Sequence, residues 1–525
     1  MELASSEKGG PHSANYPYSR NCVSQDNFMT QKQTVVWQCV SVHCCNASSI
    51  SQQTLPPAQE MKCAVALVFL SVIYVFADTF AFGSALPSRS NGSHIRSRLN
   101  LTPYIADGKI KKARRLAAVN YRRFKSDVPS YSGFFNVNKQ FNSHLFFWFF
   151  PAEYDYENAP VLLWLQGGPG FSSLFGLFNE VGPFSVAEDN VTLVMNPYSW
   201  HKNHSLVFID NPVGTGFSFT DFDEGLATNQ SQIAEELYCA LIQFFALFSE
   251  LRSLPFFIAG ESYAGKYIPS LSYTIHKRNP AAEHKINLQG IAVGNGWTDP
   301  VSMLDRSSFL YQVGLVDRKT RDEMHNMEQK TVQLIKSHDY EEATRMESKL
   351  FEYFRNHTKY DNIYNVLLER ERDTEDRFAI FVDRNKVRKA LHVGDTQFSH
   401  KNDSVSSKLF LDIMQSVRSW LEELLEHYRV LYYSGQLDII VAYTLSLNMY
   451  NALQFSAAEE YRNASRWPWY VDGQLAGYVK TAGKFTEVLV RNAGHSVPID
   501  QPAWALDLIT TFTRDKCLNR QNSHQ

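Results

Sequence analysis

The sequence predicts an α/β protein, with a mostly parallel central sheet and helices on both faces. Two observations predict this class. Short apolar runs rich in β-branched and aromatic residues recur along the chain, and longer segments with helical patterning separate most of them. The predicted strands are 145–150, 161–165, 205–209, 256–259, 288–293, 430–433 and 487–490. The predicted helices between them include 233–248, 266–276 and 420–428.

One segment, about 299–374, interrupts this alternation. It lies between the predicted strands at 288–293 and 430–433, and it is rich in Glu, Lys, Arg and Met with few strand formers. Its pattern predicts helices over 320–336 and 340–354. We expect a helical insertion here, which could also be a peripheral insert with no part in catalysis.

A serine lies at the turn between the strand 256–259 and the helix 266–276. The segment is Gly260-Glu261-Ser262-Tyr263-Ala264-Gly265. G-x-S-x-G at a strand-to-helix turn is typical of the nucleophile elbow of an α/β-hydrolase. The tight turn lifts the serine side chain out of the sheet, and small residues two positions away on each side leave room for the bend. Ser262 is therefore the candidate nucleophile.

An acid and a histidine follow the nucleophile in the order that α/β-hydrolases use. Asp438 lies in the turn after strand 430–433, and His495 lies in a glycine turn after strand 487–490. A serine hydroxyl needs an imidazole to take its proton, and the imidazole needs a carboxylate to fix its tautomer. An ordinary turn aspartate and a surface histidine are the alternatives. Order and position favour a triad of Ser262, Asp438 and His495.

A glycine-rich turn precedes the elbow along the chain. Gln166-Gly167-Gly168-Pro169-Gly170 follows the strand 161–165. In hydrolases such a loop supplies one oxyanion-hole amide, and the residue after the nucleophile supplies the other. We therefore expect Gly168 and Tyr263 to be the amide donors. A plain β-turn would explain the glycines but not their place before the elbow strand.

Taken together, these motifs resemble the serine carboxypeptidase family, which includes cathepsin A and the yeast vacuolar carboxypeptidase, and Gln166 resembles its vitellogenic-like branch. The resemblance extends from about 101 to about 513. It implies an α/β-hydrolase fold with the insertion as a cap over the substrate site, and removal of one residue from a peptide's C-terminus. Beyond the motifs above, the matching segments are Asp210-Asn211-Pro212-Val213-Gly214-Thr215-Gly216-Phe217-Ser218, Gly294-Asn295-Gly296-Trp297-Thr298-Asp299-Pro300 and Gly494-His495-Ser496-Val497-Pro498-Ile499-Asp500-Gln501-Pro502.

The resemblance also implies a site for the substrate's free carboxylate, formed by Gln166, Glu180 and Glu261. Ionising two neighbouring carboxyl groups costs free energy, so one of them keeps its proton. That protonated group can donate a hydrogen bond to the substrate carboxylate. We therefore expect activity to be strongest at acid pH. Glu180 could instead be a solvated helix glutamate. The chain departs from the family at Gln166, usually asparagine, and at Phe171, usually a cysteine in a bracing disulfide.

Two other functions keep the same fold. A related acyltransferase would resolve the acyl-enzyme with an alcohol, and a binding or protective protein would carry out no chemistry. Peptide or protein C-termini are the expected partners. The net charge of −3, with no strong basic block, argues against nucleic acid. We expect no cofactor, no metal and no membrane association of the mature protein, and a homodimer is left open.

The first 85 residues have a different character. Residues 1–60 form a polar leader, and residues 61–85 resemble a signal peptide, with Lys62 before an apolar run and small residues after it. Translation from Met61 is one hypothesis, and a type II membrane anchor is the other. The enzyme domain would span 86–525, and the protein would be secreted or lysosomal. The predicted glycosylation sites are Asn91, Asn100, Asn190, Asn203, Asn229, Asn356, Asn402 and Asn463.

Cysteine usage leaves two readings open. Of seven cysteines, only Cys239 and Cys517 lie in the enzyme domain. They could form a disulfide or remain two buried thiols.

Overall fold

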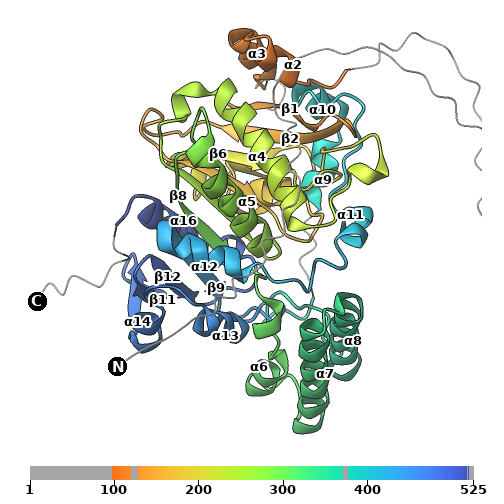
Figure 1. Cartoon of the computed structure of the whole chain (residues 1–525), viewed down its shortest axis with the longest axis vertical. Coiled ribbons are helices and arrows are strands. Elements are labelled where there is room, and N and C mark those ends of the chain that lie inside the picture. The colour runs from red at the N-terminus through yellow and green to blue at the C-terminus, as the bar shows by residue number, and fades with distance from the viewer. Residues whose placement is uncertain (1–96, 120–127, 371–375, 517, 519–525) are drawn as a thin grey trace, which may run out of the picture. The chain divides into compact units, whose positions relative to one another are not determined.

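The computed structural model describes residues 97–119, 128–370, 376–516 and 518. Its centre is a sheet of ten strands, which Figure 1 shows with helices packed around it. The six central strands run parallel to one another, and two antiparallel strands flank them at each edge. In order across the sheet they are β1 (Tyr131–Asn138), β2 (Ser143–Phe150), β6 (Ser205–Ile209), β3 (Val161–Leu165), β7 (Phe256–Glu261), β8 (Leu288–Gly294), β9 (Arg429–Gly435), β12 (Phe485–Val490), β11 (Gln474–Ala482) and β10 (Trp467–Val471).

Both faces of the sheet are buried, and β2 illustrates how. Its eight residues are all buried, because alternate side chains point to opposite faces of a strand. Leu145, Phe147 and Phe149 belong to one hydrophobic cluster. Phe146 and Trp148 belong to a second cluster on the other face. A strand covered on both faces reads as a continuous apolar run, which is how the sequence revealed it.

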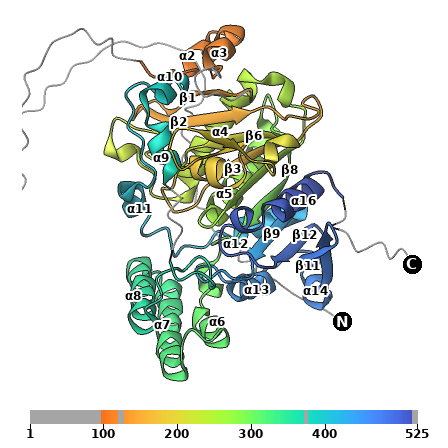
Figure 2. The same ribbon diagram turned by 180° about the vertical axis from the view of Figure 1, so that it is seen from behind.

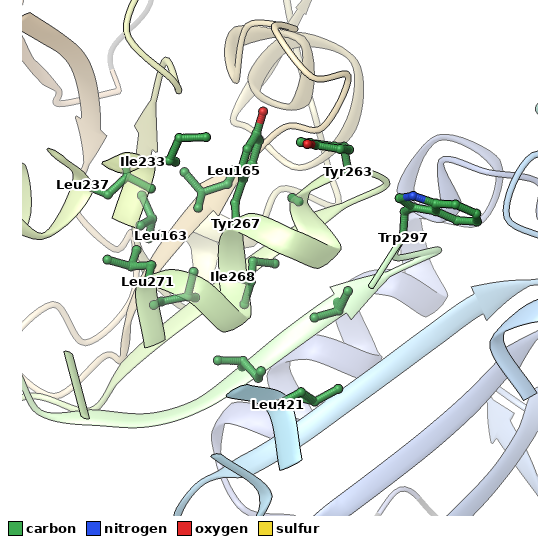
Figure 3. Packing of buried hydrophobic residues seen from close by; sticks show 14 of the residues in the cluster. Leu163, Leu165, Ile233, Leu237, Tyr263, Tyr267, Ile268, Leu271, Trp297 and Leu421 are labelled. Carbon is green, nitrogen blue, oxygen red and sulfur yellow. The ribbon is translucent and has the colours of Figure 1, made fainter. Parts of the chain in front are cut away.

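Helices cover the two faces. Helices α4 (Gln230–Leu247), α5 (Ala264–Arg278) and α12 (Arg418–His427) contribute to the first cluster, and α4 and α5 lie in front of the sheet in Figure 1. Helix α16 (Pro502–Thr513) contributes to the second cluster, on the face seen in Figure 2. Figure 3 shows Leu163 and Leu165 of β3 packing against α4 and α5.

The insertion between β8 and β9 is helical, as the sequence predicts. It contains α6 (Arg306–Gln312), α7 (Arg318–Lys336) and α8 (Tyr340–Thr358), and α7 and α8 lie side by side in both views (Figures 1 and 2). The carboxylates of Asp317 and Asp339 accept hydrogen bonds from backbone amides in the first turns of α7 and α8. That this insertion covers a substrate site stays a prediction.

A buried arginine fixes the insertion to the turn after β9. The Arg306 guanidinium donates hydrogen bonds to the carbonyl oxygens of Ile439 and Ile440, at 3.1 and 2.7 Å. It also pairs with Glu347 of α8 at 2.8 Å. Because Ile439 follows Asp438 directly, the insertion is held against the turn that carries the predicted triad acid.

The seven predicted strands are all present, with ends that differ by at most two residues. Strands β1, β10 and β11 were not predicted from the sequence, and neither was a separate hairpin of β4 (Phe184–Val186) and β5 (Leu193–Met195). The remaining helices are α2 (Thr102–Ala106), α3 (Ile110–Ala117), α9 (Arg377–Val382), α10 (Asn385–Ala390), α11 (Asp403–Lys408), α13 (Tyr443–Ala452), α14 (Ala458–Asn463) and α15 (Val497–Asp500). Short 3₁₀ or π turns occur at Gly176–Glu180, Trp200–Lys202, Asp223–Gly225, Ser249–Leu251, Asn279–Ala281 and Pro300–Ser302.

Several predictions fall outside the described residues. They are the polar leader 1–60, the signal peptide or anchor 61–85, the glycosylation site Asn91, and Cys517 with its bond to Cys239. Within the described part of the chain, no helix combines the length and apolar character that crossing a membrane requires.

Candidate active site

The predicted triad residues come from neighbouring parallel strands. Ser262 follows β7, Asp438 lies just after β9, and His495 lies after β12, while Asn295 follows β8. These four strands are adjacent and parallel in the sheet. Their carboxyl ends therefore meet at one edge, which is where open α/β sheets carry their sites.

Ser262 has the strained backbone of a nucleophile elbow. Its φ is +62°, a conformation that residues other than glycine adopt rarely. The turn is held by hydrogen bonds from Ser262 N to Gly294 O at 3.0 Å and from Trp297 N to Ser262 O at 2.9 Å. A Cβ atom at Gly260 would lie 2.1 Å from Leu165 O, so glycine is required there. The Ser262 side chain remains partly exposed and within reach of solvent.

Asp438 and His495 form a buried pair. His495 Nδ1 lies 2.8 Å from Asp438 Oδ2, which also accepts a hydrogen bond from Asn295 Nδ2 at 2.6 Å. The other carboxylate oxygen accepts from Val441 N at 3.3 Å. Burial lowers the pKa of His495, but the charge and hydrogen bond of Asp438 and the charge of Glu261 raise the pKa above 6.5 overall.

The Ser262 hydroxyl is not hydrogen-bonded to the other two triad residues. Within the described residues, the Ser262 hydroxyl makes no hydrogen bond to His495. Catalytic hydrogen bonds of hydrolases are often long without substrate and shorten in the substrate complex. The structure thus joins two of the three predicted residues directly and places the third at the same edge of the sheet.

The glycine loop that carries Gly168 contacts the elbow at Tyr263, and both predicted amide donors are available. A Cβ atom at Gly167 would lie 2.6 Å from Tyr263 N and 2.8 Å from the Ser262 Cβ, so the glycine loop touches the elbow. Gly168 has a φ of +114°, which only glycine adopts readily. Neither Gly168 N nor Tyr263 N donates a hydrogen bond to another described residue. Both amides can therefore donate to a substrate oxygen.

The predicted carboxylate-binding residues also meet. Gln166 Nε2 donates to Glu261 Oε1 at 2.8 Å, and Gln166 Oε1 accepts from Trp164 Nε1 at 3.0 Å. The Glu180 carboxyl interacts with Glu261 and shifts its pKa, and a hydrogen bond between two carboxyl groups requires a proton on one of them. Ser496 Oγ donates to Glu261 Oε1 at 2.9 Å. Glu180 is 3% exposed and Glu261 is 2% exposed, so Glu180 is not a solvated glutamate.

Burial controls the protonation of this cluster. It raises the pKa of Glu261 above 4.5, although the charge of His495 and the hydrogen bonds from Glu180, Ser496 and Gln166 act in the opposite direction. Two adjacent buried carboxyl groups share a proton more readily than both ionise. The cluster is therefore a proton donor at acid pH and an acceptor at higher pH.

Sequence reasoning gave no role to two residues of this site. Asn295 holds the Asp438 carboxylate, and Ser496 holds the Glu261 carboxylate. Signals existed for both: Asn295 ends a predicted strand in a glycine turn, and Ser496 directly follows His495. Their partners are set by strand order across the sheet, which sequence spacing alone does not give.

One group of metal-ligand residue types occurs in the described part of the chain, on the helical insertion. Atoms of Asp305, His325 and Glu328 lie within 4.8 Å of one another. Both Glu328 oxygens already accept hydrogen bonds from Ser307, at 2.8 and 2.6 Å. We assign this group a structural role.

Comparison with known proteins agrees with this geometry. The family model described as serine carboxypeptidase matches residues 122–515. The chain belongs to the serine carboxypeptidase family. It is 47% identical over 427 residues to a venom serine carboxypeptidase of Apis mellifera, covering 80% of this chain and 91% of that protein. It is 45% identical over 446 residues to a vitellogenic carboxypeptidase of Aedes aegypti, covering 83% and 93%.

A solved serine carboxypeptidase has the same fold. The crystal structure of a prohormone-processing carboxypeptidase from Saccharomyces cerevisiae superposes with a TM-score of 0.68 at 25% identity, and covers 77% of this chain and 96% of that one. The predicted family and the α/β-hydrolase fold are therefore confirmed. The protein is a serine-type carboxypeptidase, a hydrolase that acts on peptides.

Proposed function

We propose that Ser262, His495 and Asp438 release C-terminal amino acids through an acyl-enzyme. His495 Nε2 takes the Ser262 proton as the oxygen attacks the last peptide carbonyl, and then gives that proton to the leaving amine. Water, activated by the same imidazole, hydrolyses the ester. Asp438 keeps the proton on Nδ1, so that Nε2 is the basic nitrogen. The hydrogen bond between Asp438 and His495 supports this role.

The developing oxyanion would lie between the amides of Gly168 and Tyr263. Glycine at 167 and 168 lets the backbone come close to the elbow, as the contacts of Gly167 with Tyr263 N indicate. Such preorganised donors act where charge develops, and removing one donor typically lowers kcat about 10²- to 10³-fold.

The cluster of Gln166, Glu180 and Glu261 would bind the free carboxylate of the substrate. Glu261 immediately precedes the nucleophile, so a carboxylate held there places the last peptide bond at Ser262. A shared proton lets one carboxyl group donate to the incoming carboxylate. This buried carboxyl cluster beside the nucleophile is the observation that carries the proposal.

Two titrations would set the two limbs of the pH profile: the carboxyl pair favours binding at acid pH, whereas the raised pKa of His495 limits activity on the acid side. Activity falls when His495 is protonated, and binding falls as pH rises through the raised pKa of the carboxyl pair. The two titrations are linked, because the charge of Glu261 raises the pKa of His495. While the pair retains its proton, less negative charge faces the imidazole, which favours the neutral form needed as base.

Incubation of an N-blocked dipeptide at pH 5 tests the proposal. Wild type should release the free C-terminal amino acid, and Ser262→Ala should release none above the uncatalysed rate. Addition of an alcohol separates hydrolysis from acyl transfer, since a transferase would form mainly the ester. Folded protein with no release would instead favour a binding function.

We also propose a secretory route, ending in secretion or in lysosomes. Support comes from the apolar segment after Met61 and from sequons with exposed side chains at Asn229, Asn356 and Asn463. Asn402 is a poorer acceptor, because its side chain is half-buried and its Nδ2 donates to Gly214 O at 2.7 Å. N-terminal sequencing of secreted protein should give a start after residue 77, and a start near Met1 would contradict this route.

A further inference from the structure

A buried polar network involves Tyr263, the residue that follows the nucleophile in the chain. Its centre is Asp412, in the turn between α11 and α12. Asp412 Oδ2 receives the Tyr263 hydroxyl at 2.5 Å, Lys266 Nζ at 2.7 Å and Gln230 Nε2 at 2.7 Å. Lys266 Nζ also donates to the main-chain carbonyl of Asp412. All four side chains are nearly inaccessible, and Lys266 is 0% exposed.

This network satisfies its charges internally. Burial lowers the pKa of Lys266, and the charge of Asp412 acts against that shift. A fully buried ion pair is often no more stabilising than an apolar pair of similar volume. The network therefore contributes more to geometry than to stability. It holds the side chain of Tyr263, which follows the nucleophile, and that of Lys266, one turn further along α5.

Asp412 belongs to a segment that also holds the glycine loop. We call residues 400–413 the strap. Its first residue accepts a hydrogen bond, from Ser172 N to His400 O at 2.9 Å. Asn402 N donates to Gly170 O at 3.0 Å, and Ser406 Oγ donates to Pro169 O at 2.8 Å. One end of the strap thus binds the loop that carries Gly168.

The other end of the strap binds the elbow. Besides the Asp412 contacts, Trp297 Nε1 donates to Ile413 O at 2.9 Å. Trp297 N in turn binds Ser262 O. Figure 3 shows Tyr263, Tyr267 and Trp297 at the edge of the apolar cluster around α5. The apolar cluster fixes the ring of Tyr263, and the strap fixes its hydroxyl.

We propose that the Lys266–Asp412 ion pair is a positioning device for the oxyanion hole. Through the Tyr263 hydroxyl it fixes the backbone that carries the Tyr263 amide, while the strap holds the Gly168 loop at a set distance. Lys266 and Asp412 act through Tyr263 and do not touch substrate. This inference rests on the proposed donor role of the Gly168 and Tyr263 amides.

The physical reason is that an oxyanion hole works only if its donors are placed in advance. Ser262 has a strained φ of +62°, and such strain persists only where surrounding contacts hold the backbone. Without the Tyr263 hydroxyl contact, the elbow can relax and move its amide. A displacement of 1 Å in a catalytic group can lower the rate about 10²-fold.

Two variants loosen the network to different degrees. Tyr263→Phe removes one hydroxyl and keeps the ion pair, and Asp412→Asn removes the charge that orients Lys266. We expect kcat for a blocked dipeptide to fall about tenfold in the first and up to about 10²-fold in the second. KM should change less than about twofold, because the carboxylate cluster is untouched.

A transition-state probe separates positioning from general damage. An N-blocked aminoacyl aldehyde adds to the Ser262 oxygen, and its former carbonyl oxygen then occupies the oxyanion hole. Its affinity should fall in parallel with kcat in both variants, while the affinity for a ligand with only a C-terminal carboxylate stays unchanged. Equal losses for both ligands, or full kcat in Tyr263→Phe, would overturn the proposal.

Two controls keep the test decisive. Lys277→Met removes a lysine from the same helix that pairs with Glu423 on the surface, and it should leave kcat unchanged. The double variant Lys266→Met with Asp412→Leu replaces the ion pair by apolar side chains, so it should fold and still show the kcat loss. Full kcat in this folded double variant would contradict the proposal. Ser262→Ala is measured in parallel, and activity in that variant would refute the catalytic assignment itself rather than the positioning role.

Discussion

The two residues that flank Ser262 enter two opposite kinds of polar network. Glu261 joins a second carboxyl group, an amide and a hydroxyl, so that like charges meet and a proton must lie between them. Tyr263 joins a lysine and an aspartate, so that opposite charges meet and no proton needs to be shared. Both networks are buried, and they differ in how they respond to pH.

The difference separates two tasks of the site. A carboxyl pair that shares a proton changes charge within the working pH range, which suits recognition of a carboxylate. An ion pair needs no shared proton, which suits a fixed framework. We therefore attribute the pH dependence of the enzyme to the Glu261 side and the placement of the oxyanion amides to the Tyr263 side.

The largest effect should come from Asp438, which belongs to neither network and contacts His495 directly. Asp438→Asn leaves the His495 partner in place but allows the wrong imidazole tautomer, so kcat should fall about 10⁴-fold. Steady-state kinetics at pH 5 with a blocked dipeptide measures it. KM should stay within a few-fold of wild type. A loss of less than tenfold would mean that Asp438 is not the triad acid.

Removing one charge from each network should change the free energy of unfolding in different ways. Lys266→Met leaves Asp412 buried without its cation and should lower the free energy of unfolding by about 3 kcal/mol. Glu261→Gln removes a charge whose burial is unfavourable, so stability should be unchanged or higher. Urea unfolding at pH 7 compares the two variants. Similar losses in both would show that the networks are not opposite in kind.

The pH profile should then change on the Glu261 side alone. Glu261→Gln removes a charge that raises the pKa of His495, so the acid limb of kcat/KM should move to lower pH. It also removes the shared proton, so the decline toward higher pH should flatten. Tyr263→Phe should lower the whole profile without shifting either limb. A shifted limb in Tyr263→Phe would contradict the proposal that the pH dependence belongs to the Glu261 network alone.

The smallest effect should come from an exposed pair on α5. Lys277 is paired with Glu423, and its side chain is 49% exposed. Surface ion pairs contribute little, so Lys277→Met should change the free energy of unfolding by less than about 0.5 kcal/mol. The same urea series measures this. A loss comparable to that of Lys266→Met would mean that burial does not explain the difference between the two lysines.

Much of the fold could be predicted because its parallel strands are buried on both faces. Such strands read as apolar runs, and turns with glycine mark their ends. The β10–β11 hairpin was missed although a signal existed. Asp472 and Gly473 both have positive φ and form the Asp-Gly turn typical of tight hairpins. β1 was missed because Gly133 and two asparagines weaken its apolar pattern.

The site divides in a similar way. Ser262, Asp438 and His495 carry local signals, since each follows a strand in a glycine turn. Lys266 directly follows the elbow motif, but nothing near it in the sequence indicates that it is buried. Asp412 has no local signal, because its partner lies 146 residues away in the chain. Partners joined by the packing of a loop on a helix require the structure.

The KM of two substrates as a function of pH tests the central claim most directly. One is an N-blocked dipeptide with a free carboxylate, and the other is the same dipeptide as its C-terminal amide. Because the carboxyl pair of Glu180 and Glu261 loses its proton as pH rises, the KM of the free acid should increase from pH 5 to pH 8. The KM of the amide should vary much less. Parallel curves for the two substrates, or a KM of the free acid that stays flat, would contradict recognition of the C-terminus by this pair.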